Sequence, residues 1–419
     1  MKESGKKYKY TLINYITMLD IKLESSNDFS FADSSTRLFF TIRISGRKEN
    51  VHQQKGITGN WLIIVIDQSS SMVGEKLETA KQAAISAINE LNPGNYVSIY
   101  SFSDEVEVVA DHTSLNDVKR LENGIREITA HGRTALFKTM DFIINKARPY
   151  AEDAGSVTLI MLTDGQPTDV TDIHRYESIA GMAAEYGIKI NSIGIGSDYN
   201  EEIIKKISDI TNGEFYNIVD RSQIGTIFGS YVQQLNKTVA TSAVMSLNLR
   251  EGTDFKSYDQ NFIQQGNQYL LNIGMISDIP FLITGQVVVP PGKEGIVNVM
   301  NISIDYKDEN GSSKSESIEF KITRTNDSKK IFSGTRQDII NAARVKMNVE
   351  KFEYLTSVGD ITGATKAIGE ARKAAEATKN IKLIESTRKL ENIVSSTPTG
   401  KVDKKQIYNE TSRIKKKGD

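Results

Sequence analysis

Residues 61–71 read WLIIVIDQSSS, an unbroken apolar run followed by an acid, a glutamine and three serines. Six apolar residues in a row are typical of a short strand that is covered on both faces. A second run of this kind, SVTLIMLTDG at 156–165, also leads into an acid. The two runs predict neighbouring strands of a mostly parallel sheet, with polar residues at their carboxyl ends.

Helical and strand patterns alternate around these two runs. The stretch after residue 71 spaces Leu77, Ala80, Ala84 and Ile88 for one helix face. Further strands are predicted at 96–102, 188–196 and 214–219, and helices at 115–128, 136–147, 173–186, 201–207 and 222–235. Strands that alternate with helices at this spacing imply right-handed βαβ units. We therefore predict a doubly wound, Rossmann-like α/β domain over residues 57–238.

The flanks of this domain carry strand patterns only. Two β-rich runs, 8–23 and 37–44, precede it, and they are too few to bury a sheet face alone. Residues 239–325 contain five more strand patterns separated by turn-rich pieces such as PPGKEG. We predict that segments 1–56 and 239–325 form one β-sandwich, into which the α/β domain is inserted.

The C-terminal part is helical. Residues 331–397 contain three helical segments, split at Val358-Gly359-Asp360 and near Asn380, which predicts a three-helix bundle. Its alanine-rich stretch 364–377 is explained most simply as a tightly packed helix; a docking surface or a dimer contact is the alternative. Residues 398–419 end in RIKKKGD and are predicted to be a solvated basic tail.

The composition narrows the classes of function. A formal net charge of −1 gives no general electrostatic reason to bind nucleic acid. The absence of cysteine excludes disulfides, thiolate metal sites and a cysteine nucleophile. Asn14, Thr17 and Asp20 interrupt the apolar run near the N-terminus, and no apolar stretch is long enough to span a bilayer. We expect a cytoplasmic protein with no transmembrane segment.

Three short pieces of sequence carry the candidate chemistry: DQSSS at 67–71, HGRT at 131–134 and TDG at 163–165. In an open α/β sheet, ligands bind in the crevice outside the carboxyl ends of the strands. The first and third pieces follow strands directly, and the second lies in a loop that could reach the same edge. Together they offer two carboxylates and three hydroxyls, from Asp67, Ser69, Ser71, Thr134 and Asp164. Such hard oxygen ligands favour Mg²⁺, with Mn²⁺ or Ca²⁺ as substitutes.

This set resembles the metal-ion-dependent adhesion site (MIDAS) of von Willebrand factor A domains, whose pattern is D-x-S-x-S, a distant Thr and then Asp. The resemblance covers about residues 60–235, and the downstream part resembles bacterial and archaeal chloride-channel-like A-domain proteins. It implies that Ser69, Ser71 and Thr134 contact the metal directly. It also implies that Asp67 and Asp164 bind the metal directly or through water.

Two residues depart from the family pattern. Ser70 stands where glycine is common, and Arg133 stands where a second glycine often precedes the threonine. Neither change removes a ligand. Arg133 is expected to bring positive charge near the ion, which would weaken metal binding or favour acidic partners.

The resemblance implies a non-enzymatic module for metal-dependent protein–protein interaction, an intracellular adaptor or assembly subunit. A partner's Asp or Glu would complete the coordination of the ion. The alternative is a surface adhesin or extracellular assembly subunit that uses the same site. A Mg²⁺-dependent enzyme is disfavoured, because no general base or second set of carboxylates is evident. His131 could lie near the metal, but an exposed loop histidine is the simpler interpretation.

Overall fold

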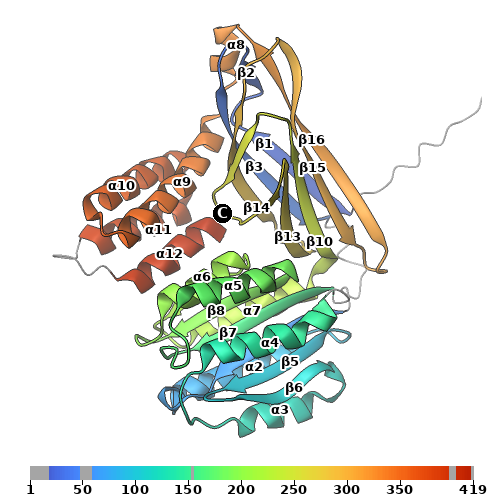
Figure 1. The fold of residues 1–419 in the computed structure, drawn as a ribbon, viewed down its shortest axis with the longest axis vertical. Helices are drawn as coiled ribbons and strands as arrows, with labels where there is room; N and C mark the ends of the chain where they lie inside the picture. The colour runs from blue at the N-terminus through green and yellow to red at the C-terminus, as the bar shows by residue number, and fades with distance from the viewer. Residues whose placement is uncertain (1–17, 48–58, 152–154, 396–402, 417–419) are drawn as a thin grey trace, which may run out of the picture.

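The computed structural model describes residues 18–47, 59–151, 155–395 and 403–416. They form three units: a β-sandwich, an α/β domain, and a helical bundle that lies beside both (Figure 1). The strand predicted at 8–23 is observed from Leu19 onward, and residues 8–17 lie outside the described part. No helix of the described residues is long and apolar enough to cross a bilayer.

The α/β domain is built on a six-stranded sheet with the order β6-β5-β4-β7-β8-β9. Its strands are β4 (Asn60–Asp67), β5 (Tyr96–Phe102), β6 (Val106–Ser114), β7 (Ser156–Thr163), β8 (Ile188–Ile195) and β9 (Phe215–Ile218). All neighbours pair in parallel except β6, which is antiparallel to β5 at the edge. The mostly parallel sheet confirms the predicted fold class, but the sequence patterns did not predict β6.

Helices cover both faces of this sheet, as a doubly wound fold requires. Alternate residues of β4 point to opposite sides: Leu62 and Ile64 pack with one layer, Trp61 and Ile63 with the other. One layer holds α2 (Glu75–Glu90), α3 (Val118–Glu127) and α7 (Gln223–Asn236), and the other holds α4 (Leu136–Ala151), α5 (Ile173–Glu185) and α6 (Glu201–Ile210). Burial on both faces explains why β4 is apolar without alternation.

The sandwich is formed from both flanks of the α/β domain. One sheet has the order β1-β3-β14-β11 and the other β12-β13-β10-β15-β16-β2. Strand β3 pairs antiparallel with β14 over nine residue pairs, from Phe281 opposite Ile44 to Val289 opposite Thr36. This pairing confirms that the α/β domain is an insertion. The strands are β1 (Leu19–Ser25), β2 (Phe29–Phe31), β3 (Thr36–Gly46), β10 (Thr238–Leu249), β11 (Asp254–Ser257), β12 (Ile263–Gln265), β13 (Gln268–Ser277), β14 (Phe281–Val289), β15 (Gly295–Lys307) and β16 (Ser313–Thr325).

The C-terminal unit contains α9 (Gln337–Ser357), α10 (Ile361–Thr378), α11 (Ile381–Ser395) and α12 (Lys404–Lys416), after the short α8 (Ser328–Ser333). The prediction of a solvated tail over 398–419 is wrong where α12 forms. Ile407, Thr411 and Ile414 are buried, and their spacing of four and three residues places them on one helix face. Because lysines flank these residues, the sequence did not reveal the apolar face. The alanine-rich helix α10 is closely packed, as predicted.

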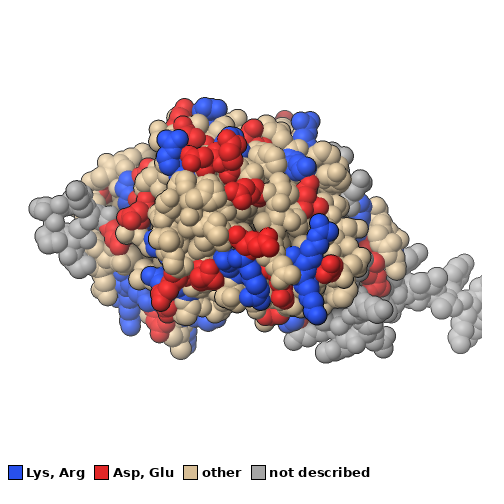
Figure 2. All heavy atoms as spheres, turned by 90° about the horizontal axis from the view of Figure 1, so that it is seen from below, with Lys and Arg blue, Asp and Glu red and all other residues tan. Residues whose placement is uncertain are grey.

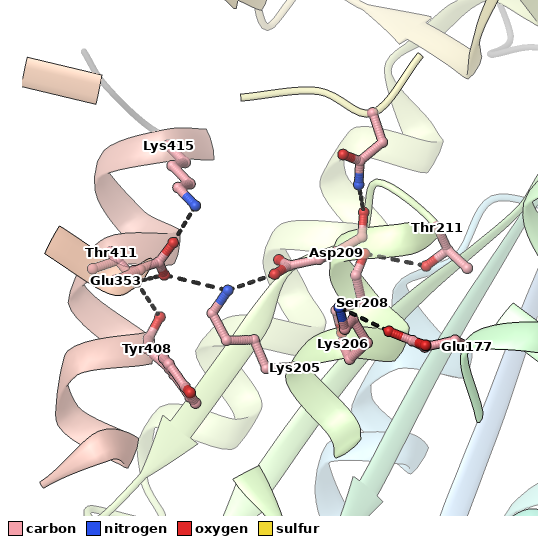
Figure 3. A network of polar contacts seen from close by, with 11 residues as sticks. Glu177, Lys205, Lys206, Ser208, Asp209, Thr211, Glu353, Tyr408, Thr411 and Lys415 are labelled. Carbon is pink, nitrogen blue, oxygen red and sulfur yellow. Dashed lines mark hydrogen bonds and ion pairs between the residues drawn. The ribbon is translucent and has the colours of Figure 1, made fainter. Parts of the chain in front are cut away.

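A buried ionic network joins this bundle to the α/β domain (Figure 3). The Nζ of Lys205, on α6, lies 2.5 Å from the Oδ2 of Asp209 and 3.3 Å from the Oε1 of Glu353, on α9. Glu353 also pairs with Lys415 and accepts a hydrogen bond from Thr411, both on α12. Burial alone would raise the pKa of Glu353, but the two ammonium groups outweigh it and hold this pKa well below its usual range.

We predict that Glu353→Gln loosens the bundle from α6, because Lys205 and Lys415 lose a buried counter-charge. Amide exchange in α12 should accelerate on the order of a hundredfold, equivalent to about 3 kcal/mol. Glu350→Gln is the matched control on α9, since Glu350 pairs with Lys256 at an exposed position. The control should change exchange by less than about fivefold, or about 1 kcal/mol.

The effect of Glu353 should also depend on pH. A carboxyl whose pKa is lowered by folding contributes stability above its unfolded pKa of about 4.3, and this contribution is lost as the pH falls further. The difference in exchange between the wild type and Glu353→Gln should therefore shrink below about pH 4. A constant difference down to about pH 2 would show that charge is not the cause.

Candidate metal centre

The carboxylate of Asp67 is held in one orientation at the end of β4. The residue is fully buried. Its Oδ1 accepts a hydrogen bond of 2.8 Å from the backbone N–H of Ser69, and its Oδ2 accepts one of 2.6 Å from the hydroxyl of Thr163. Burial raises the pKa of Asp67 to about 6, although these hydrogen bonds lower it. Since burial disfavours the charged form, a cation nearby would stabilise the ionised carboxylate.

Ser69 and Ser71 bring their hydroxyls to the carboxylate at the end of β7. After Asp67 the chain turns through the short 3₁₀ helix η1 (Ser70–Met72) into α2. The Oγ atoms of Ser69 and Ser71 are 3.0 Å apart, and Ser71 donates a hydrogen bond of 2.6 Å to the Oδ1 of Asp164. Asp164 is fully buried. The oxygens of these three residues therefore form one continuous chain.

The loop before α4 is tied to the same edge of the sheet by backbone hydrogen bonds. The N–H of His131 donates to the carbonyl of Gln68 at 2.7 Å, and the N–H of Ser70 donates to the carbonyl of Gly132 at 3.1 Å. These bonds bring the 131–134 loop beside the 67–71 loop, as the sequence predicted for Thr134.

Thr134 itself lies against the third loop, after β7. Its carbonyl accepts a hydrogen bond of 2.8 Å from the N–H of Thr168, and its own N–H donates to the hydroxyl of Thr168 at 3.2 Å. A Cβ placed on Gly165 would come within 2.6 Å of the Oγ1 of Thr134. The hydroxyl of Thr134 therefore lies over the residue that follows Asp164, where only glycine leaves room for it.

The sequence did not single out Lys76, in the first turn of α2. Its Nζ lies 2.5 Å from the Oδ2 of Asp164 and 3.3 Å from the carbonyl oxygen of Ser71. The ammonium group supplies positive charge to a carboxylate that has no access to solvent. Only its position on the first turn after the 67–71 loop, at the carboxyl edge of the sheet, could have indicated this role.

Arg133 is placed differently from the expectation. Its side chain is exposed, and its Nε pairs with the Oδ1 of Asp104 at 2.9 Å. A hydrogen bond from Arg133 lowers the pKa of Asp104. The positive charge in contact with Asp164 thus comes from Lys76. His131 is the exposed loop residue of the simpler interpretation, with its ring next to the carbonyl of Thr129 and the carboxylate of Glu107.

The donor set fits a hard divalent cation. It combines two buried carboxylates with three hydroxyls, all oxygen, and an ammonium group already lies against one of the carboxylates. No cluster of three or more His, Cys, Asp and Glu side chains suited to a metal occurs in the described part of the chain. A metal at this edge would therefore depend on the hydroxyl groups, which distinguishes the site from carboxylate-rich or imidazole-rich centres.

Comparison with known proteins agrees with this architecture. Residues 62–230 match the family model of the von Willebrand factor type A domain. Residues 337–417 match the family model of the C-terminal domain of archaellum regulatory network B proteins. An uncharacterized protein of Synechocystis is 26% identical over 188 residues. That match covers 45% of this chain and 44% of the relative, so the chain spans less than half the length of this relative.

Two solved structures resemble nearly the whole chain. The ArnB paralog VWA2 from Sulfolobus acidocaldarius superposes with a TM-score of 0.72 at 25% identity, covering 96% of this chain and 99% of that one. A von Willebrand factor type A protein from Catenulispora acidiphila gives a TM-score of 0.76 at 18% identity, covering 95% and 96%. The arrangement of all three units is therefore shared with known structures.

We predict that Gly165→Ala destabilises the α/β domain by about 1–3 kcal/mol, because the added methyl group displaces Thr134. The control is Gly181→Ala in α5, where a Cβ meets nothing within 4 Å. This control should be neutral or should stabilise the domain by about 0.5–1 kcal/mol, as alanine does in a helix. Thermal unfolding measures both. An unchanged midpoint for Gly165→Ala would contradict a fixed position of the Thr134 hydroxyl.

Proposed function

We propose that this chain, which is a von Willebrand factor type A domain protein, binds a protein partner through a divalent cation at the carboxyl edge of its sheet. Mg²⁺ is the proposed ion, with Mn²⁺ or Ca²⁺ able to replace it. The residues proposed to hold it are Asp67, Ser69, Ser71, Thr134 and Asp164. The observation that carries the proposal is the meeting of three loops at one edge of the sheet, where Ser71 donates a hydrogen bond to the buried carboxylate of Asp164 and the hydroxyl of Thr134 lies over Gly165.

The hydrogen bonds support a division of roles among the five residues. Both oxygens of Asp67 accept hydrogen bonds from neutral protein groups, whereas one oxygen of Asp164 is held by the ammonium group of Lys76, which an ion would replace. This difference favours contact of Asp67 with the ion through water. Asp164, Ser71 and Ser69 share one chain of short contacts and are proposed as direct ligands, together with Thr134. The bound cation would supply an electrophilic centre for a partner's Asp or Glu carboxylate. The five residues would hold the ion, and the partner's carboxylate would complete its coordination.

The surface around the site supports binding to a protein. Val73, 72% exposed, follows the Ser69–Ser71 segment, and Val219, 81% exposed, follows the carboxyl end of β9. A salt bridge between Glu75 and Arg221 joins the two segments that carry these valines. Two exposed apolar side chains beside a salt bridge would suit the apolar centre and polar rim of a protein interface. Figure 2 shows acidic and basic side chains interspersed over the end of the molecule formed by the α/β domain, so one broad charged patch is not the basis of the proposal.

The same metal-dependent binding would serve either an intracellular adaptor or a surface assembly subunit. We propose the adaptor, in agreement with the sequence expectation of a cytoplasmic protein. Cell fractionation distinguishes the two, since exposure of the protein on the cell surface would overturn the adaptor proposal and leave the metal chemistry intact.

Lys76 should compete with the metal for Asp164. We predict that Lys76→Met strengthens Mn²⁺ or Mg²⁺ binding about tenfold, because removal of the ammonium group abolishes a charged hydrogen bond of about 1.5 kcal/mol that the ion must displace. Arg133→Met is the matched control; Arg133 pairs with Asp104, so affinity should change less than about twofold. Isothermal titration calorimetry measures both affinities. A larger effect of Arg133→Met than of Lys76→Met would reverse the assignment of the competing charge.

Partner capture tests the whole proposal. Thr134→Val keeps the shape of the side chain and removes its hydroxyl, so metal affinity should fall at least about tenfold, or 1.4 kcal/mol. Partners retained by the wild-type chain in Mg²⁺ should be lost with EDTA and with Thr134→Val. Asp104→Ala serves as the control, since this nearby acid is not among the proposed ligands. Partners that resist both EDTA and Thr134→Val would refute a metal-bridged interaction.

A further inference from the structure

A second feature lies at the opposite end of the same sheet. A cavity of about 310 Å³ opens where the α/β domain, the sandwich and the helical bundle meet. Lys189, near the amino end of β8, lines it from the α/β domain, Phe281 from β14, and Lys416 from α12. Figure 1 shows α12 running between the bundle and the α/β domain toward β14. The candidate metal centre is at the carboxyl ends of the strands, so the two sites are separate.

The charges that line this cavity are unbalanced. Three lysines, Lys189, Lys382 and Lys416, contribute to the wall, against a single acid, Glu214. The Nζ of Lys416 lies 3.2 Å from the neutral Oε1 of Gln260. The cavity wall therefore carries a net positive charge.

Lys189 faces an aromatic ring. Its Nζ is 5.8 Å from the centroid of Phe281. Within the described residues, neither Lys189 nor Lys416 forms an ion pair with a carboxylate. An aromatic ring offsets only part of the loss of hydration of an ammonium group.

The nearby acids already have cationic or hydrogen-bonding partners. Asp259 pairs with Lys346 at 2.6 Å, and Asp209 pairs with Lys205 at 2.5 Å. Glu214 accepts a hydrogen bond from the hydroxyl of Tyr216. Among the residues that the structure describes, these contacts leave the two cavity ammonium groups without a carboxylate in direct ion pairing.

Partial burial disfavours the charged form of both lysines. Burial lowers the pKa of Lys189, against the attraction of Glu214. Burial also lowers the pKa of Lys416, to about 8, and the charge of Lys189 adds to the effect. Two desolvated like charges are unfavourable unless a counter-ion compensates them.

We propose that this cavity binds a small dianionic oxyanion of the phosphate class between Lys189 and Lys416. Two ammonium groups call for two negative charges, and lysine acts as a point charge toward phosphate oxygens. Asn212, Gln234 and Ser277 also line the cavity and offer amide and hydroxyl donors. A bound oxyanion would join β8 to α12 and so hold the bundle against the α/β domain. Free phosphate and the phosphate group of a small phosphomonoester are the two possible sources.

Thermal unfolding and calorimetry test this site in buffer that contains EDTA, so that the candidate metal centre takes no part. Inorganic phosphate should raise the unfolding midpoint of the wild type relative to chloride at equal ionic strength, and glycerol 3-phosphate tests the second source. Lys189→Met and Lys416→Met should each weaken phosphate binding at least about tenfold. Lys404→Met is the control and should bind phosphate like the wild type, because Lys404, at the start of α12, pairs with Glu202 and does not line the cavity.

The sign of the stability change provides a second readout. Without phosphate, Lys189→Met and Lys416→Met should be as stable as the wild type or more so, because each removes a partly buried charge that no carboxylate of the described residues pairs with. With saturating phosphate the wild type should become the most stable of the three. Equal stabilisation of all variants by phosphate, or no binding of either probe to the wild type, would overturn the proposal. Tighter binding of glycerol 3-phosphate than of inorganic phosphate would identify the phosphomonoester as the source.

Discussion

Two carboxylates without access to solvent, those of Asp67 and Asp164, impose the constraint on which the rest of the site depends. Asp67 ends β4 and Asp164 follows β7, two strands covered on both faces, so neither carboxylate is solvated by bulk water. Hydrogen bonds from Ser69, Thr163 and Ser71 orient them, and Lys76 supplies a positive charge to Asp164. The three loops meet around these two carboxylates, whose negative charges require a positive charge nearby. A site that an ammonium group reaches so directly is also one that a metal ion could use.

The sequence predicted the centre of the α/β domain because its strands leave an unambiguous pattern. Burial on both faces makes β4 and β7 continuous apolar runs, and the order of loops follows from parallel strands whose carboxyl ends share one edge. That Thr134 reaches this edge was a prediction from the same geometry, and the close approach of Gly165 to its hydroxyl agrees with it. Whether the five residues bind a metal stays a prediction.

The elements that the sequence missed have weaker local patterns. Strand β6 is an edge strand and is only partly buried, so its residues do not form an apolar run. Helix α12 buries Ile407, Thr411 and Ile414 on a narrow face, while lysines occupy much of the rest. The contact of Lys76 with Asp164 joins residues 88 positions apart, and no local pattern reports the direction of a long side chain. In each case tertiary packing, rather than local propensity, determines the outcome.

The two ends of the central sheet serve different purposes. At the amino ends, Ser242 of the sandwich donates a backbone hydrogen bond to Gly155, and Gly187, with a φ of 70°, leaves no room for a Cβ beside Asn272. Lys205 and Glu353 fix the bundle to α6 on the side of the same domain. These contacts hold the domain from its amino ends and one flank and do not involve the loops at the carboxyl ends. A partner could therefore bind at the carboxyl edge while the sandwich and the bundle keep their places. Conversely, an anion at the amino ends would change how firmly α12 is held without touching the proposed metal ligands.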